Sequence, residues 1–284
     1  MPSPSSVATA AIRAVALLFA IALPFSAAAL ELNGDTVQGG VVIGKVEAGS
    51  TVSMDGRKIL VSPEGDFVLG FGRDEAGEKV LTVEDSDGAK SQQTFTVKKR
   101  EYRVERVDGL PPKTVTPDPE SLARIKKDAQ LVSSARARRD ERTDYTGGFI
   151  WPASGRISGV YGSQRVLNGN PRRPHFGVDI AAPTGHPICA PAGGLITMAE
   201  PDLYYSGGTI VLDHGQGLSS SFLHMSKVLV KTGDVVKQGD LIGEIGSTGR
   251  ATGPHLDWRM NWLDKRVDPS VLVEGEPQPL PVEN

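Results

Sequence analysis

The sequence has a single cysteine, Cys189, in 284 residues. One thiol cannot form an intramolecular disulfide, so the fold must depend on an apolar core rather than on cross-links. Cys189 lies between Ile188 and Ala190. This apolar setting predicts a small buried residue rather than a reactive one.

The chain also lacks an excess of charge of either sign, since its formal net charge is −3. Such a balance gives no overall attraction to nucleic acid or to an anionic membrane surface. The basic run 136–142 is interrupted by Asp140 and Glu141. We therefore interpret it as a solvated helix end rather than a polyanion site, and we expect no nucleic-acid partner.

The N-terminal apolar run is too short to span a membrane. It extends from Ala14 to Phe25 after Arg13, and Ala27-Ala28-Ala29 then offers an A-x-A cleavage site. A spanning helix needs about 20 apolar residues. Residues 1–29 are therefore predicted to be a signal peptide, with an uncleaved anchor as the alternative. We expect export to the periplasm or cell envelope, with no stable membrane insertion after cleavage.

Glycine and proline are abundant, and they indicate a mainly β fold. The 33 glycines are about 12% of the chain, above the usual share of about 7%. With the 20 prolines, they predict many tight turns. Residues 30–105 read as a small β-sandwich-like domain of short alternating runs. Asp55-Gly56 and Asp87-Gly88 are hairpin dipeptides there, because glycine accepts the positive φ of such turns. This segment has no histidine and no cysteine, and nothing in it suggests chemistry.

A linker with a helix is predicted for residues 106–146. Its prolines exclude a continuous strand, and Asp118 can cap a helix that begins at Pro119. Apolar residues at helical spacing extend this helix to about Asp140. Residues 147–273 then form a second β domain, in which strand-like runs alternate with glycine turns. The Pro- and Glu-rich tail 274–284 is predicted to be disordered.

All five histidines lie in the second β domain, between His175 and His255. Three local patterns stand out: His175-Phe176-Gly177-Val178-Asp179, Ser221-Phe222-Leu223-His224 at the end of a predicted strand, and Gly253-Pro254-His255-Leu256-Asp257-Trp258. On a strand, residues two apart point to one face, so His255 and Asp257 project together. A catalytic zinc site needs three protein ligands and an open position. His175, Asp179 and Asp257 can supply them.

These patterns resemble the lysostaphin-type (LytM-like) zinc metallopeptidases, which carry an H-x-x-x-D motif and a later H-x-H motif. The likeness extends over residues 150–272 and includes the flanking text Ile180-Ala181-Ala182-Pro183 and Gly246-Ser247-Thr248-Gly249-Arg250. It implies a C-terminal antiparallel-β peptidase domain. By position it implies His175, Asp179 and Asp257 as Zn²⁺ ligands, and His224 and His255 as catalytic residues.

The chain departs from the family pattern at Asp257, where the family has histidine. Carboxylate oxygen is an accepted zinc donor. However, two carboxylates leave the bound ion formally neutral, so it should acidify its water less. On this basis, replacing Asp257 with histidine is expected to preserve or raise activity.

The remaining candidates have structural alternatives. Tyr161 matches an aromatic position of the family's groove, although a packed aromatic is an equal interpretation, and Arg165 is a candidate for binding a substrate carboxylate. His214 is expected to be structural, in a hairpin turn, and His186 to be exposed in a loop. Trp258 and Trp262 are most simply core or rim residues.

The resemblance implies an exported zinc metalloendopeptidase that hydrolyses the peptide cross-links of peptidoglycan. The alternative is a weak or inactive peptidoglycan-binding module that activates another cell-wall hydrolase. Four of the five motif positions are unchanged, which favours the enzyme. A third interpretation, a carbohydrate- or protein-binding β protein with incidental histidines, does not explain the order of the motifs.

Overall fold

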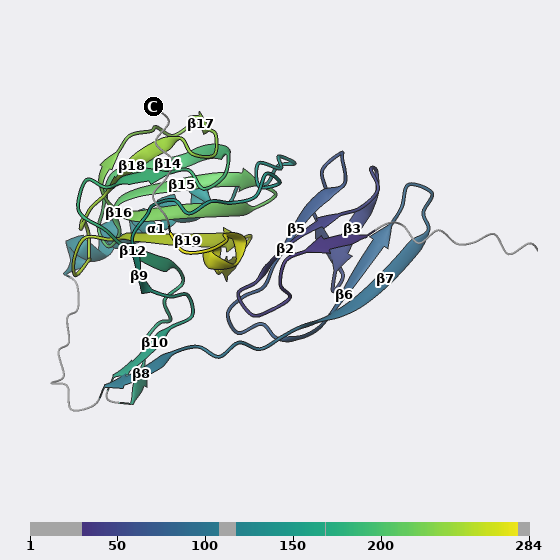
Figure 1. The fold of residues 1–284 in the computed structure, drawn as a ribbon, viewed down its shortest axis with the longest axis horizontal. Coiled ribbons are helices and arrows are strands. Elements are labelled where there is room, and N and C mark those ends of the chain that lie inside the picture. Colours follow the sequence, from purple (N-terminus) through teal and green to yellow (C-terminus); the bar gives the residue numbers. More distant parts are fainter. Residues whose placement is uncertain (1–29, 108–117, 168, 278–284) are drawn as a thin grey trace, which may run out of the picture.

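The computed structural model describes residues 30–107, 118–167 and 169–277. Within these residues the fold is mainly antiparallel β with one α-helix, as predicted (Figure 1). The predicted signal peptide and most of the predicted tail lie outside the described residues. In the described part of the chain, no helix is long and apolar enough to cross a membrane.

The N-terminal half forms two sheets, one of order β1-β2-β5 and one of order β4-β3-β6-β7. Their strands are β1 (Glu31–Asn33), β2 (Val41–Lys45), β3 (Thr51–Met54), β4 (Arg57–Ile59), β5 (Asp66–Gly70), β6 (Gly77–Glu84) and β7 (Lys90–Val97). The turn between β3 and β4 has positive φ at both Asp55 and Gly56, as the hairpin dipeptide predicts. β8 (Val104–Val107) leaves this half and pairs in parallel with β10.

The C-terminal half is built around a ten-stranded sheet whose main path is β17-β14-β15-β16-β19-β12-β9. Its elements are β9 (Arg156–Gly159), β12 (Val178–Ala181), β13 (Pro187–Cys189), β14 (Gly194–Leu203), β15 (Gly207–Gly215), β16 (Leu218–Val228), β17 (Val235–Val236), β18 (Leu241–Ile245), β19 (Leu256–Trp262) and β20 (Lys265–Val267). β10 (Gln164–Leu167), β11 (Asn170–Pro171) and the 3₁₀ helix η1 (Pro269–Leu272) complete the described elements.

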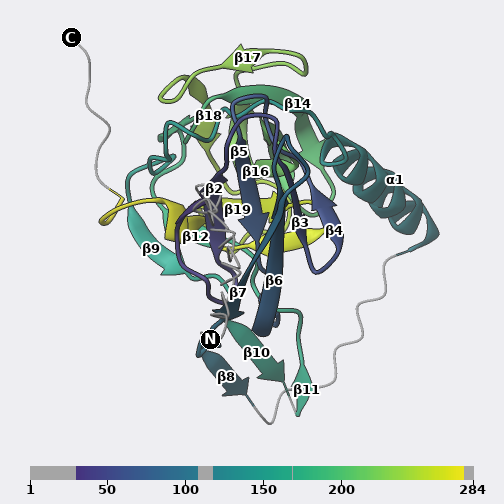
Figure 2. The same cartoon turned by 90° about the vertical axis from the view of Figure 1, so that its right-hand side faces the viewer.

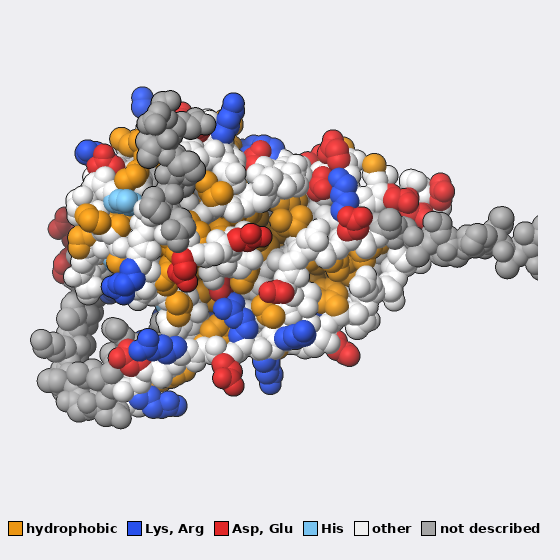
Figure 3. Space-filling view, in the orientation of Figure 1, with side chains coloured by type: hydrophobic (Ala, Val, Ile, Leu, Met, Phe, Trp, Pro, Cys, Tyr) orange, Lys and Arg blue, Asp and Glu red, His pale blue; other side chains and the backbone are white. Residues whose placement is uncertain are grey.

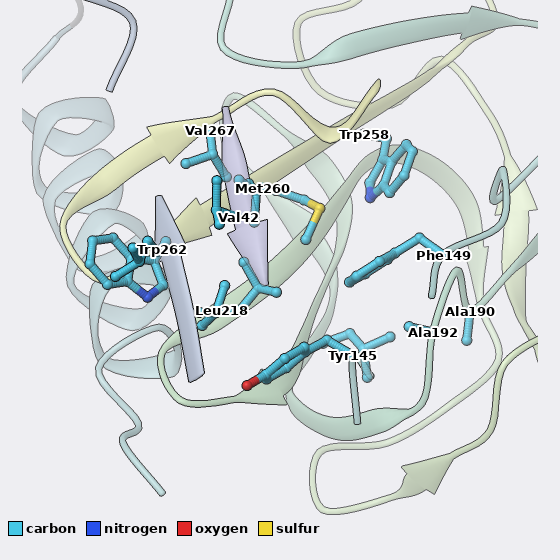
Figure 4. Packing of buried hydrophobic residues seen from close by; sticks show 14 of the residues in the cluster. Val42, Tyr145, Phe149, Ala190, Ala192, Leu218, Trp258, Met260, Trp262 and Val267 are labelled. Atoms are coloured by element: carbon cyan, nitrogen blue, oxygen red, sulfur yellow. The ribbon is translucent and has the colours of Figure 1, made fainter. Parts of the chain in front are cut away.

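One apolar core joins the two halves. Val42 of β2 packs among Leu218, Met260, Trp262 and Val267 of the C-terminal half, and all five are almost completely buried (Figure 4). Figure 3 shows apolar side chains gathered where the halves meet on this face. Each such side chain contributes about 1.5–3 kcal/mol when fully buried. The two halves therefore share one apolar core.

Helix α1 (Pro119–Ala135) lies beside β14 (Figure 2). Asp118 is its N-cap and accepts a hydrogen bond from the backbone N–H of Ser121, as predicted. Val132 and Ala135 pack against Met198 and Leu203 of β14. The helix ends about one turn earlier than the sequence predicts.

The prediction that residues 136–142 are solvated is wrong for two of the arginines. Arg136 is half-buried, and its Nε is buried without a hydrogen-bond partner. Arg142 forms ion pairs with Asp140, Asp144 and the buried Asp213 of β15. Arginines of this basic run thus connect the segment after α1 to the sheet.

His214 is a core residue, as expected, although it lies within β15 rather than in a turn. It is fully buried, with its Nδ1 2.7 Å from the Gly193 carbonyl and its Nε2 2.8 Å from Ser220 Oγ. The carbonyl only accepts, so Nδ1 carries the hydrogen and Nε2 accepts from Ser220. Burial lowers the pKa of His214 to about 4. Cys189 is also buried, as predicted.

We expect His214 to make the protein less stable as the pH falls from about 6.5 to 4. In this window the unfolded chain binds a proton that the folded His214 does not, so unfolding becomes more favourable at lower pH. The full shift corresponds to about 3 kcal/mol. Urea unfolding of wild type and His214→Gln between pH 4 and 7 measures the difference. Parallel curves for the two proteins would contradict a neutral buried His214.

Candidate metal centre

Three neighbouring strands, β12, β19 and β16, bring the three motifs together. Asp179 on β12 lies directly opposite Asp257 on β19, and Gly159 of β9 flanks Asp179 on its other side. On β16, Leu223 lies opposite Asp257, which places the following His224 beside the same point. The sheet therefore assembles residues that are separated by up to about 80 positions in the sequence.

His175 precedes β12 in a segment held by two backbone hydrogen bonds. Its N–H donates to the Ser163 carbonyl at 2.8 Å, and its own carbonyl accepts from Gly162 at 2.8 Å. Its Nε2 lies 3.1 Å from Asp179 Oδ1, yet both atoms are buried and neither has a hydrogen-bond partner. One donor atom from each of His175, Asp179 and Asp257 lies within 4.8 Å of the others.

Two glycines make room for the carboxylates. A Cβ on Gly159 would lie 2.2 Å from Asp179 Oδ2, and a Cβ on Gly177 would lie 2.5 Å from Asp257 Oδ1. Both distances are below any allowed contact, so a side chain at either position would displace a carboxylate. Gly177 belongs to the His175–Asp179 motif, and the need to leave room for Asp257 explains why this position is a glycine.

The imidazoles of His224 and His255 lie side by side, with ring centroids 4.8 Å apart. His224 Nδ1 is 2.8 Å from the Thr248 carbonyl, and His255 Nδ1 is 2.8 Å from the Gly253 carbonyl. Carbonyl oxygens only accept, so each Nδ1 donates and each Nε2 is left as a proton acceptor. His255 Nε2 lies 4.0 Å from Asp179 Oδ1, beside the proposed ligands.

His224 does not end its strand, as the sequence suggested, but lies within β16. Its φ is +65°, a left-handed conformation that is rare for a residue with a side chain. Its N–H donates to the Ser206 carbonyl at 2.8 Å. Such strain persists where the surroundings impose it, and it is found preferentially at functional sites.

Arg259, which the sequence analysis did not single out, is the partner of Asp257. Its Nε lies 2.9 and 3.0 Å from the two carboxylate oxygens of Asp257, and one terminal nitrogen lies 2.5 Å from Oδ2. The spacing i, i+2 on a strand is the signal that would have found it, since it places Arg259 on the face of Asp257. Together the two residues carry no net charge.

This pair changes the electrostatic expectation for the substitution at Asp257. Alone, a carboxylate in place of histidine makes the site more negative by one charge. Arg259 cancels that charge, so the site would hold a divalent cation in the same formal charge balance as a site with a neutral histidine. Bidentate hydrogen bonds from the guanidinium also orient the carboxylate, as outer partners of metal ligands commonly do.

The charges around the site shift the pKa values of three of its groups. Burial lowers the pKa of His175, but the carboxylates of Asp179 and Asp257 outweigh it and raise the value. Burial also raises the pKa of Asp257, and Arg259 outweighs this and lowers it. The pKa of His224 is lowered, chiefly by burial. His224 is therefore a neutral imidazole near neutral pH.

The structure gives the other candidates different surroundings. Tyr161 is 3% exposed, and its hydroxyl donates to the Arg266 carbonyl at 2.8 Å, so its surroundings are those of a packed aromatic. Arg165 lies on β10, and its side chain is outside the described part of the structure. His186 is half-buried rather than exposed, with its Nε2 2.9 Å from Ser154 Oγ. Trp258 and Trp262 are core residues.

Comparison with known proteins identifies the family. The sequence pattern of Peptidase family M23 matches residues 173–269. The crystal structure of a peptidase M23 from Pseudomonas aeruginosa is 30% identical, with a TM-score of 0.64, and the match covers 84% of this chain and 95% of that one. The chain belongs to peptidase family M23. The likeness to the Pseudomonas structure also extends beyond the M23 region into the N-terminal β sheets.

Two curated relatives of the M23 region have different descriptions. Peptidoglycan DD-endopeptidase ShyA of Vibrio cholerae is 41% identical over 87 residues, which are 31% of this chain and 20% of ShyA. The lipoprotein NlpD/LppB homolog of Pseudomonas aeruginosa is 35% identical over 123 residues, which are 43% of this chain and 39% of that protein. The chain thus matches less than half the length of either relative.

The donor atoms of this M23 site fit a divalent cation. His175 Nε2 and Asp179 Oδ1 are buried, close together and without hydrogen bonds, as two ligands of one ion would be. Asp257 adds a third oxygen, and its pairing with Arg259 leaves a carboxylate its outward lone pairs. One nitrogen and two oxygens suit zinc, with harder ions such as Mn²⁺ as competitors.

Proposed function

We propose that the protein is an exported, metal-dependent endopeptidase that hydrolyses peptide cross-links of peptidoglycan. The observation that carries the proposal is the convergence of His175 Nε2, Asp179 Oδ1 and Asp257 beside two imidazoles with free Nε2 atoms. Membership of family M23 and the likeness to ShyA support peptidoglycan as the substrate.

His175, Asp179 and Asp257 would hold the metal, and the paired imidazoles would manage protons. A bound zinc ion polarises a carbonyl and lowers the pKa of water. His255 and His224 each present Nε2 as an acceptor, because their Nδ1 hydrogens are used by backbone carbonyls. One of them can take a proton from the attacking water, and the other can stabilise the oxygen of the tetrahedral intermediate once protonated.

Replacing His255 with alanine is expected to lower turnover by about 10²–10⁴-fold, the usual contribution of a general acid or base. Zinc content should stay near that of wild type, since His255 is assigned no ligand role. Cleavage of isolated cross-linked peptidoglycan and elemental analysis of the same samples measure both quantities. His186→Ala is the matched control, because His186 contacts Ser154 outside the centre. Loss of zinc in His255→Ala would assign it to the metal instead.

The proposal of export rests on the predicted signal peptide, residues 1–29. It predicts a mature protein that begins near Leu30 and lies in the periplasm or cell envelope. Mass spectrometry of protein recovered from the envelope tests this. Recovery of the chain with residues 1–29 intact would favour an N-terminal anchor. The division into a domain at 30–105, a linker at 106–146 and a peptidase domain at 147–273 likewise remains a proposal.

A second function is favoured by the Asp257–Arg259 ion pair. This pair neutralises the third ligand position by itself, so the site can be held together without a metal. The protein would then bind peptidoglycan and activate a separate cell-wall hydrolase. Wild-type protein that binds peptidoglycan, retains no zinc after dialysis against it and cleaves nothing would establish this alternative.

A further inference from the structure

A large cavity lies between helix α1 and the face of the sheet that carries the metal centre. Its volume is about 840 Å³, within the range of about 300–1,000 Å³ that small-molecule sites occupy. Ile125, Ala129 and Val132 of α1 form one wall. Leu223 and Arg259 belong to the opposite wall, and these two residues adjoin the catalytic imidazole and the metal ligand. The cavity therefore adjoins the metal centre through Arg259, which is paired with Asp257.

Arginines dominate the charged lining of this cavity. They are Arg136, Arg139, Arg173, Arg259 and Arg266. Its two acidic residues are both engaged elsewhere, since Asp128 accepts from the Tyr204 N–H at 2.8 Å and Asp264 from Arg57 at 3.3 Å. With Arg259 paired to Asp257, four arginines against two aspartates leave the cavity positive, although the whole chain is slightly negative.

Four of these arginines have no acidic partner among the residues that the structure describes; one of them, Arg139, is exposed and donates only to backbone carbonyls. Arg136 donates to Ser221 Oγ at 2.9 Å, while its Nε is buried and unbonded. Arg266 donates to Asn261 Oδ1 at 3.0 Å, and the Arg173 guanidinium lies over the Phe176 ring. Burial and the neighbouring arginines lower the pKa of Arg136 to about 9 and that of Arg266 to about 10. Such a cluster costs stability unless an anion joins it.

Strand register places these groups in order along the floor of the cavity. Asp257, Arg259 and Asn261 lie on one face of β19, about 7 Å apart per step of two residues. Ser221, which Arg136 reaches, lies opposite Arg259, and Arg266 lies opposite Asn261. The positive row thus begins about one step from the metal ligand and continues away from it.

The geometry points to this cavity as a subsite that binds the free carboxylates of the peptide substrate, with Arg136 and Arg266 as the specificity-determining residues. This inference rests on the proposed function, because it places the scissile bond at the metal centre. A peptide in extended conformation has the same rise as β19, so a carboxylate a few residues from the scissile bond falls over the arginines. Guanidinium groups bind carboxylates with paired hydrogen bonds, which no other side chain matches.

A small inorganic anion fits the charge but not the space. Phosphate would occupy a minor part of about 840 Å³, whereas the apolar wall of α1 can contact the body of a peptide. A purely structural role for Arg136, through its bond to Ser221, leaves its buried Nε and its charge unused. Peptidoglycan stem peptides combine apolar alanine residues with several carboxylates, and they match both features.

Calorimetric titration of the purified zinc-loaded protein with a diaminopimelate-containing stem tetrapeptide tests the inference. The peptide with free carboxylates should bind at least about tenfold more tightly than the same peptide fully amidated, and the advantage should shrink with added salt. Arg136→Gln and Arg266→Gln should each lower the affinity for the peptide with free carboxylates by about tenfold or more. Neither should change the affinity for the amidated peptide. Arg106→Gln, an exposed residue on β8, is the matched control.

Two further measurements separate binding from folding and from catalysis. Arg136→Gln should unfold at the same or a higher temperature than wild type, because it removes a buried charge without a partner; a structural arginine would give a lower temperature. In cleavage assays, both variants should raise KM more than they lower kcat. Zinc content should remain unchanged in both.

Equal affinity of the wild type for the free and amidated peptides would overturn the inference. So would an unchanged affinity for the free peptide in both Arg136→Gln and Arg266→Gln. Inorganic phosphate that binds as tightly as the peptide and depends on the same arginines would reduce the cavity to a simple anion site, which also contradicts it. If the arginine-dependent binding is found but zinc and cleavage are not, the endopeptidase proposal fails and the carboxylate subsite stands.

Discussion

Replacing Asp257 with alanine is expected to remove zinc and peptidase activity together. Without its carboxylate only His175 and Asp179 remain, and two protein ligands do not meet the three that a catalytic zinc site uses. We expect the loss of zinc affinity to exceed about 100-fold, the upper end of the effect of losing an outer partner of a ligand. The substitution also leaves the Arg259 guanidinium unpaired beside the site, which repels the ion further.

Equilibrium dialysis against zinc and cleavage of cross-linked peptidoglycan measure the two losses. Asp257→Asn separates charge from shape, since it keeps an oxygen in place but removes the negative charge. Its zinc affinity and activity should fall between those of Asp257→Ala and the wild type. Asp87→Asn, in an exposed turn of the N-terminal half, is the control for removal of one negative charge. Full zinc content in Asp257→Ala would show that Asp257 is not a ligand.

Replacing Asp257 with histidine is expected to damage the site unless Arg259 is replaced as well. The sequence alone suggests that histidine restores the ligand set of the family. In the structure, that change leaves the partly buried Arg259 guanidinium without its carboxylate, which lowers the free energy of unfolding. The unpaired cation also adds one positive charge next to the metal. Asp257→His alone should therefore be less stable and bind zinc more weakly than wild type.

The double variant Asp257→His/Arg259→Gln should recover both properties. Histidine then supplies a neutral ligand, and glutamine fills much of the arginine's volume without a charge. Urea unfolding and zinc affinity of the wild type, the two single variants and the double variant complete a double-mutant cycle. We expect a coupling of at least about 2 kcal/mol, given the bidentate geometry. Additive effects would show that Arg259 does not compensate the change at Asp257.

The sequence singles out the three residues whose donor atoms converge in the structure, His175, Asp179 and Asp257, and their role as metal ligands is our proposal. His175 and Asp179 flank Gly177, and the structure shows that a side chain at Gly177 would displace Asp257. The mainly β class likewise follows from the glycine and proline content, and the start of α1 follows from Asp118 as a cap. The motif and the helix cap depend on residues that are neighbours in the chain, and the fold class depends on composition.

Only the tertiary structure decided how the charges of the site are balanced. The sequence contains Arg259 two residues after Asp257, but the pairing depends on both side chains sharing one face of β19, where a partly buried charge without a partner costs stability. Arg136 is more distant still, since it reaches β16 across 85 residues. Local patterns fix which residues share a strand face. Which buried charges meet depends on the packing of α1 and the strands, because Coulomb and desolvation energies depend on distance in space and not along the chain.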